Sequence, residues 1–191
     1  MRFSDGTSMR LYRQTVEDFG LFAGAELTDK EMSDLRKAAG SMSAKMRAVR
    51  IVAASSVSKK DLEHRLVQKG ESLDDAQDAV AWMSEMQLVD DLKTAEQVVA
   101  RCITKGYGLS RAKQALFEKQ IPKEYWDQVL MDYPDQIDAI VRYLQTHLEN
   151  TADSRDVKKA IDALIRRGHS YGRIRRVLEQ LALETDDLPE G

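Results

Sequence analysis

The sequence repeats one helical pattern three times, and this repetition constrains the fold more strongly than any other feature. The three copies begin at positions 62, 112 and 160: LEHRLVQKGESLDDAQDAV, AKQALFEKQIPKEYWDQVL and AIDALIRRGHSYGRIRRVL. In each copy an apolar residue is followed four positions later by a leucine, and the pattern then breaks at Gly70, Gln120 or Gly168. Two residues after each break comes a residue that suits a helix start: Ser72, Pro122 or Ser170. Each copy therefore predicts a helix, a tight break and a second helix.

A further helical stretch precedes each copy. These stretches are SAKMRAVRIVAAS, DLKTAEQVVARCITKG and PDQIDAIVRYLQTHLEN, and their apolar residues have helical spacing, as Ala95, Val98, Val99 and Cys102 do. The sequence thus predicts a mainly α protein of three tandem three-helix repeats, over residues 41–88, 89–133 and 134–184. Because repeats of this kind pack mainly on their neighbours, we expect an elongated array.

The two ends of the chain differ from the repeats. Residues 1–40 contain an Asp5-Gly6 pair between short apolar stretches, which predicts a small β-hairpin. A helix follows in TDKEMSDLRKAA, where Thr28 and Glu31 have the spacing of a capping box. Residues 185–191 are acidic and without periodicity, so we expect a flexible tail there.

Composition narrows the class of protein. The chain of 191 residues has only three prolines and ten glycines. Few residues therefore interrupt regular structure, which favours helices over many short strands. Its one cysteine, Cys102, excludes an internal disulfide and suits a reducing compartment. No apolar run reaches the roughly 18 residues of a membrane span, and the opening MRFSDGTSMR lacks the apolar segment of a secretory signal. We expect a cytoplasmic protein with no membrane association.

The residues that most often carry out catalysis are scattered. His64, His147 and His169 lie far apart in the sequence, and no cluster has the spacing of metal ligands. Cys102 falls on the apolar side of its predicted helix, which is typical of a buried structural thiol rather than a nucleophile. We therefore predict that the protein is not an enzyme and that it requires no cofactor and no metal.

Positive charge is concentrated towards the end of the chain. Residues 155–176 hold eight Lys and Arg against two Asp, a net charge of +6 in a chain whose formal net charge is −3. Arg166 and Arg167 end a predicted helix, where the helix dipole favours cations. Three arginines in the first turns of the next helix oppose its dipole: Arg173, Arg175 and Arg176. We therefore favour an external anion as their partner over a merely solvated helix face.

Two kinds of anion suit guanidinium groups, namely the phosphates of DNA and the carboxylates of an acidic protein surface. The candidate binding residues are Lys158, Lys159, Arg166, Arg167, Arg173, Arg175, Arg176, Arg111 and Lys113. Basic residues of the first two copies either extend this surface as a discontinuous stripe or occupy ordinary exposed helix positions. The sequence leaves both interpretations open.

Four motifs, in their order and spacing, resemble the RecX family of bacterial regulatory proteins. They are Ser58 with Asp61-Leu62 and Lys69-Gly70, then Asp91 with Ala95, then Gly108 with Arg111, and last Leu164 with Arg166, Arg167 and Gly168. The resemblance covers residues 41–182, and the family also accommodates the N-terminal hairpin. The chain departs from the family's pattern at Thr94, Ala112 and Gln120, which stand where an aromatic residue, a larger aliphatic residue and a glycine are usual.

The resemblance implies a non-enzymatic regulator that binds the RecA recombinase, or its filament on single-stranded DNA. The family generally restrains filament growth, and with it recombination and ATP hydrolysis, in DNA repair and the SOS response. The expected form is a monomer that lodges in the filament groove. The alternative is a protein that binds DNA directly through helix-turn-helix-like modules. Against it, the second helices of the first two copies are acidic or neutral, and phosphates would not attract them.

Overall fold

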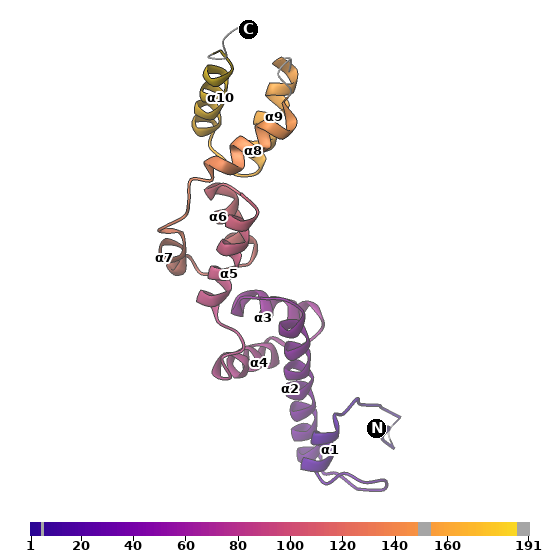
Figure 1. The fold of residues 1–191 in the computed structure, drawn as a ribbon. Coiled ribbons are helices and arrows are strands. Elements are labelled where there is room, and N and C mark those ends of the chain that lie inside the picture. Colours follow the sequence, from indigo (N-terminus) through magenta and orange to yellow (C-terminus); the bar gives the residue numbers. More distant parts are fainter. Residues whose placement is uncertain (5, 149–153, 187–191) are drawn as a thin grey trace. The chain divides into compact units, whose positions relative to one another are not determined.

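A computed structural model describes residues 1–4, 6–148 and 154–186. The chain divides into two compact units, Met1–Asp90 and Asp91–Gly191, which are described separately. The described residues form ten α-helices and one 3-10 helix and contain no strand, so the predicted mainly α class is confirmed (Figure 1). Within the same residues, no helix has both the length and the apolar composition needed to cross a membrane.

The first unit is built on one long helix. Its helices are α1 (Arg13–Asp18), α2 (Asp29–Ala54), α3 (Lys59–Gln68) and α4 (Leu73–Glu85). At the start of α2, the Glu31 amide donates to the Thr28 hydroxyl at 3.2 Å, and the Thr28 amide donates to the Glu31 carboxylate at 2.8 Å. The capping box expected from the sequence is therefore confirmed. The helices α3 and α4 also begin at capping serines, Ser58 and Ser72.

Helix α2 is continuous across two predicted helices. The predicted boundary between residues 40 and 41 lies inside it. Gly40 is a poor helix former, but a Cβ at this position would lie 2.7 Å from a carboxylate oxygen of Asp75, near the start of α4. This glycine therefore marks a close approach of α4 to α2 rather than the end of a helix.

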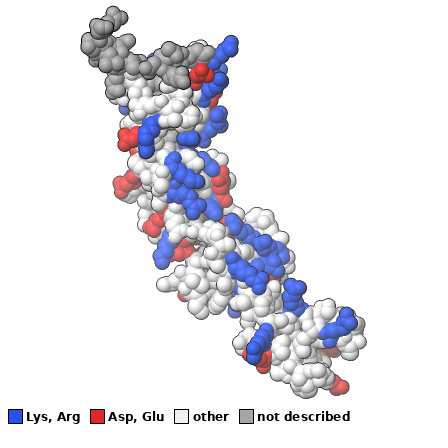
Figure 2. All heavy atoms as spheres, turned by 45° about the vertical axis from the view of Figure 1, so that its right-hand side comes forward, with Lys and Arg blue, Asp and Glu red and all other residues white. Residues whose placement is uncertain are grey.

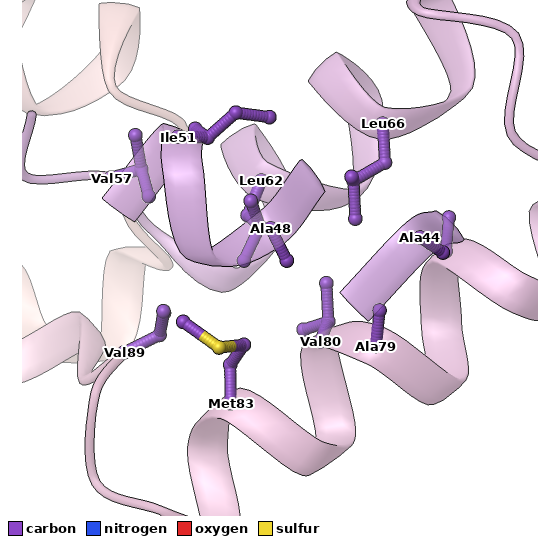
Figure 3. Close-up of a cluster of buried hydrophobic side chains, with 11 residues drawn as sticks. Ala44, Ala48, Ile51, Val57, Leu62, Leu66, Ala79, Val80, Met83 and Val89 are labelled. Atoms are coloured by element: carbon purple, nitrogen blue, oxygen red, sulfur yellow. The ribbon is translucent and has the colours of Figure 1, made fainter. Parts of the chain in front are cut away.

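The C-terminal half of α2 shares a hydrophobic core with α3 and α4. Figure 3 shows the side chains that the three helices direct toward one another: Ala44, Ala48 and Ile51 from α2, Leu62 and Leu66 from α3, and Ala79, Val80 and Met83 from α4. The alanines let the helix axes approach, and the larger side chains fill the space between them. An ion pair of 2.5 Å between Arg47 and Glu71 ties α2 to the turn between α3 and α4.

The predicted N-terminal hairpin is not formed as a pair of strands in the described residues. One isolated antiparallel bridge joins Arg2 and Ser8. Asp5 lies outside the described residues, and Gly6 has the positive φ of 82° that suits a tight turn. The first arm holds only Met1 to Phe3, and two short strands without a third are marginally stable, so a full ladder does not form.

The second unit contains two groups of helices, each with its own buried cluster. The helices are α5 (Asp91–Thr104), α6 (Leu109–Glu118), η1 (Lys123–Tyr125), α7 (Trp126–Leu130), α8 (Ile137–His147), α9 (Ser154–Arg166) and α10 (Tyr171–Asp186). One cluster includes Leu116 and Ile121, and the other includes Leu144 and Leu164. Helix α10 takes in the first two residues of the predicted flexible tail, and residues 187–191 lie outside the described residues.

The three helix breaks expected from the sequence share one backbone geometry. The residue at the break has a positive φ in each case: 93° at Gly70, 53° at Gln120 and 88° at Gly168. Its amide donates to the carbonyl three residues earlier, and the next amide donates to the carbonyl of the buried leucine, at N–O distances between 2.8 and 3.1 Å. This is the Schellman motif, which satisfies carbonyls at the end of a helix. Gln120 adopts it without a glycine, so the departure from the family's pattern leaves this turn intact.

Candidate partner-binding surface

The predicted basic residues of α9 lie on one exposed face. Lys158, Lys159 and Arg166 are exposed, whereas Ala160 and Leu164 are buried on the other side of the same helix. Residues three, four or seven positions apart share a side of an α-helix. The helix therefore packs its apolar side into the core and presents cations to solvent.

Two arginines of α10 pair with exposed carboxylates of the same chain. Arg173 forms an ion pair with Asp135, just before α8, and Arg175 pairs with Glu179 at 2.7 Å. The hydrogen bond to Glu179 is the main cause of a raised pKa at Arg175. These two carboxylates correct part of the prediction from the sequence, which favoured an external anion as the partner of both arginines. The Glu179 pairing has the four-residue spacing visible in a sequence, whereas the Asp135 contact depends on the tertiary fold.

Other predicted cations have no internal partner among the described residues. They are Lys113, Lys158, Arg166 and Arg176, and all four are exposed. Lys159 differs because it pairs with Asp156 at 2.9 Å. We call Lys158, Arg166 and Arg176 the basic surface of α9 and α10. These cations can bind a carboxylate or a phosphate without first breaking an ion pair.

Positive side chains also cover more of the visible surface than negative ones do in Figure 2, where Lys and Arg are blue and Asp and Glu are red. The net charge of the whole chain is nevertheless −3. Exposed cations can thus attract an acidic partner locally even though the chain as a whole is acidic.

Two predicted binding residues have structural contacts instead of free head groups. The Arg167 guanidinium lies 4.4 Å from the ring centre of Tyr143, a cation–π contact. Arg111 is half-buried and pairs with Glu118 at 2.9 Å, and this hydrogen bond raises the pKa of the guanidinium. The Arg167 contact links the end of α9 to α8, whereas the Arg111 pair lies within α6. Neither side chain is part of the basic surface.

Two motifs that carry the family resemblance meet in the second unit. The Gly108 amide donates to the Arg167 carbonyl at 2.9 Å. A Cβ at Gly108 would overlap the carbonyl of Gly168, and a Cβ at Gly168 would overlap the backbone nitrogen of Arg111. The loop between α5 and α6 therefore packs backbone to backbone against the turn between α9 and α10. We call this contact the glycine junction.

Two further side chains, His169 and Tyr133, complete the glycine junction. The sequence pattern indicated no role for either of them. The buried His169 donates from Nε2 to the Gly106 carbonyl at 3.0 Å, because a carbonyl oxygen can only accept. Burial lowers the pKa of His169, and the nearby cations of Arg167 and Arg173 lower it further. The Tyr133 hydroxyl donates to the Tyr107 carbonyl at 2.6 Å, and burial raises the pKa of Tyr133 to about 12. The neighbouring glycines at 106 and 108 were the sequence signal for this close packing.

The single cysteine belongs to the core, as predicted. Cys102 is buried on α5, and burial raises the pKa of its thiol. A raised pKa reduces the fraction of reactive thiolate at neutral pH. Its position is that of a structural residue.

Comparison with known proteins gives one consistent result. No protein-family model matches the sequence. The chain is similar to a regulatory protein RecX of Vibrio parahaemolyticus, with 23% identity over 142 residues, which are 73% of this chain and 92% of the relative. It is 30% identical over 96 residues to a regulatory protein RecX of Cronobacter sakazakii, covering 45% of this chain and 58% of that relative.

A solved structure shares the fold. The crystal structure of a regulatory protein RecX matches with a TM-score of 0.67 at 17% identity, over 93% of this chain and 91% of the other. Sequence similarity over most of a relative's length and a shared fold over most of this chain lead to the same assignment. The sequence and fold comparisons together support the assignment of this chain to the RecX family of regulatory proteins.

Proposed function

We propose that this chain is a non-enzymatic regulator of the RecA recombinase that binds the recombinase filament on single-stranded DNA and restrains recombination and ATP hydrolysis. The observation that carries the proposal is the similarity to regulatory RecX proteins along most of the chain. The link to RecA and the inhibitory sign come from the family resemblance.

We further propose that three repeats, over residues 41–88, 89–133 and 134–184, act as three binding modules of one monomer. Each of these ranges holds most or all of a buried hydrophobic cluster and one of the Schellman turns at Gly70, Gln120 and Gly168, which supports a common design. Once one module is bound, the others bind as intramolecular events. Several weak contacts together therefore give a high overall affinity. One molecule bound in this way can contact several recombinase subunits at once.

The basic surface supplies an electrostatic contribution in this proposal. Lys158, Arg166 and Arg176 are exposed and have no ion-pair partner within the described residues. Carboxylates of the recombinase or phosphates of its bound DNA can neutralise them. Contacts of this kind increase the association rate, and salt weakens them.

The direct test is ATP hydrolysis by RecA on single-stranded DNA, with this protein added below and above one molecule per recombinase subunit. The proposal predicts strong inhibition well below equal amounts. Unchanged hydrolysis at every ratio would overturn it.

A charge reversal tests the basic surface within the same assay. The test variant carries Lys158→Glu, Arg166→Glu and Arg176→Glu. The matched control carries Lys37→Glu, Arg36→Glu and Arg50→Glu, which change the same residue types at exposed positions of α2. We expect the test variant to inhibit about tenfold less well than the control. Equal inhibition by the two variants would remove the basic surface from the mechanism.

A further inference from the structure

The Schellman turns at the three helix breaks, Gly70, Gln120 and Gly168, carry an exposed apolar side chain at the same position. This position lies three residues before the residue with the positive φ. Its carbonyl accepts a hydrogen bond from the amide of that residue. It is occupied by Val67, Phe117 and Ile165, whose exposed fractions are 40%, 69% and 46%. These side chains belong to α3, α6 and α9, each the helix that ends at the turn.

Helix geometry explains why these side chains face outward. In each turn the preceding residue is a fully buried leucine: Leu66, Leu116 or Leu164. Adjacent residues of an α-helix point about 100° apart, so the residue after a buried leucine is directed towards the surface. Fold stability therefore does not require an apolar side chain at this position, and a polar residue would fit it equally well.

A cation accompanies each of these apolar side chains. Two residues further along stand Lys69, Lys119 and Arg167. Single exposed apolar residues are common on proteins and need no explanation. An exposed apolar side chain with a cation at a fixed offset, present at each of the three equivalent turns, does need one.

The composition of these sites indicates the chemistry of the partner. An apolar side chain gains free energy by entering an apolar depression. The charge of the adjacent cation favours carboxylates at its edge, and Arg167 keeps that charge while its guanidinium lies over the Tyr143 ring. Three local surfaces of the same kind suit a partner that presents the same site several times. A polymer of identical protein subunits has this property, whereas a DNA backbone offers no apolar depression.

We propose, on the basis of the function proposed above, that Val67, Phe117 and Ile165 are contact residues for the recombinase filament. Each enters an apolar, carboxylate-edged site that recurs on the filament's subunits. Phe117 contributes most because it exposes the largest apolar area. The contacts act separately from the basic surface, and their contribution is less sensitive to salt.

The chain contains a matched control for this proposal. The test variant carries Val67→Gln, Phe117→Gln and Ile165→Gln. The control carries Val49→Gln, Phe22→Gln and Ile137→Gln, which change the same three residue types at similar exposures of 37%, 69% and 42%. All six positions are exposed, so urea denaturation should give similar stabilities for the two variants. Affinity is then measured for RecA-coated single-stranded DNA, with the recombinase held in the filament by a non-hydrolysable ATP analogue, at low and raised salt.

We expect the test variant to bind the filament at least about 30-fold more weakly than the control at both salt concentrations, because a few anchoring side chains dominate most interfaces. The control should bind within about twofold of the unsubstituted protein. If the unsubstituted protein binds but the test variant binds equally well, this inference is wrong while the proposed function stands. If the unsubstituted protein does not bind the filament, the proposed function fails and the inference fails with it.

Discussion

The turn at Gly70 in the first unit and the turn at Gly168 in the second have the same backbone geometry and very different surroundings. Both glycines have a positive φ, near 90°, and both end a helix with the same pair of hydrogen bonds. A Cβ added at Gly70 would meet nothing within 4 Å. A Cβ added at Gly168 would overlap the backbone at Arg111, across the glycine junction.

The difference shows that a turn can need a glycine for either of two separate physical reasons. At Gly70 the only reason is conformational, because side chains other than glycine resist a positive φ. At Gly168 the positive φ also favours glycine, and in addition a close backbone contact between two groups of helices leaves no room for a side chain. The sequence motif is alike at both sites, so only the tertiary structure separates the two roles.

The largest effect that this comparison predicts is that of Gly168→Ala. The substitution adds left-handed strain and a steric overlap, which together should lower the free energy of unfolding by about 3 kcal/mol. Urea denaturation followed by circular dichroism measures the change. If the free energy of unfolding falls by less than about 1 kcal/mol, the backbone of the glycine junction can shift to accommodate the methyl group with little loss of stability.

The matched substitution Gly70→Ala should cost much less. Only the positive φ opposes the new methyl group, so we expect a loss of about 1 kcal/mol in the same experiment. A cost equal to that of Gly168→Ala would show that the surroundings of the two turns do not matter, and the comparison would then be wrong.

Acid should weaken the glycine junction to a smaller extent. Burial lowers the pKa of His169 in the folded protein below the ordinary value of about 6.5. The stabilisation is therefore complete above that ordinary pKa and is lost as the pH falls through the lowered one. The protonated ring still donates to Gly106, which limits the loss. Urea midpoints between neutral and mildly acidic pH should fall more for the unsubstituted protein than for His169→Gln, and parallel curves would contradict this assignment.

The smallest predicted effect is a gain. Gln87 ends α4 in a further Schellman turn, with a φ of 56° and an exposed side chain. Gln87→Gly removes the left-handed strain but makes the unfolded chain more flexible, so we expect a net stabilisation of about 0.5 kcal/mol. A loss of stability in urea denaturation would show that the glutamine relieves its own strain through contacts at this turn.

Local features of the fold were predictable from the sequence because neighbouring residues determine them. The capping box of Thr28 and Glu31 and the helix breaks at Gly70, Gln120 and Gly168 belong to this group. The continuity of α2 was not predictable, since Gly40 is explained by a contact with α4 that is distant in sequence.

The sequence predicted which basic residues are exposed at the candidate site, but not which of them have partners within the chain. The exposed face of α9 follows from helical periodicity, and the structure places Lys158 and Arg166 on it. The ion pair between Arg173 and Asp135 and the packing of Arg167 on Tyr143 arise from tertiary contacts. Sequence spacing alone therefore could not separate cations that are free to bind a partner from those that hold helices together.

The most direct test of the proposed function compares two targets of this protein: naked single-stranded DNA and the same DNA coated with RecA. Fluorescence anisotropy of a labelled oligonucleotide gives the first affinity, and co-sedimentation with the preformed filament gives the second, each at two salt concentrations. A regulator of the filament should bind the coated DNA much more tightly and with a shallow dependence on salt. Equal or tighter binding to naked DNA, with a steep dependence on salt, would contradict the proposal and make the cations of α9 and α10 a direct DNA contact.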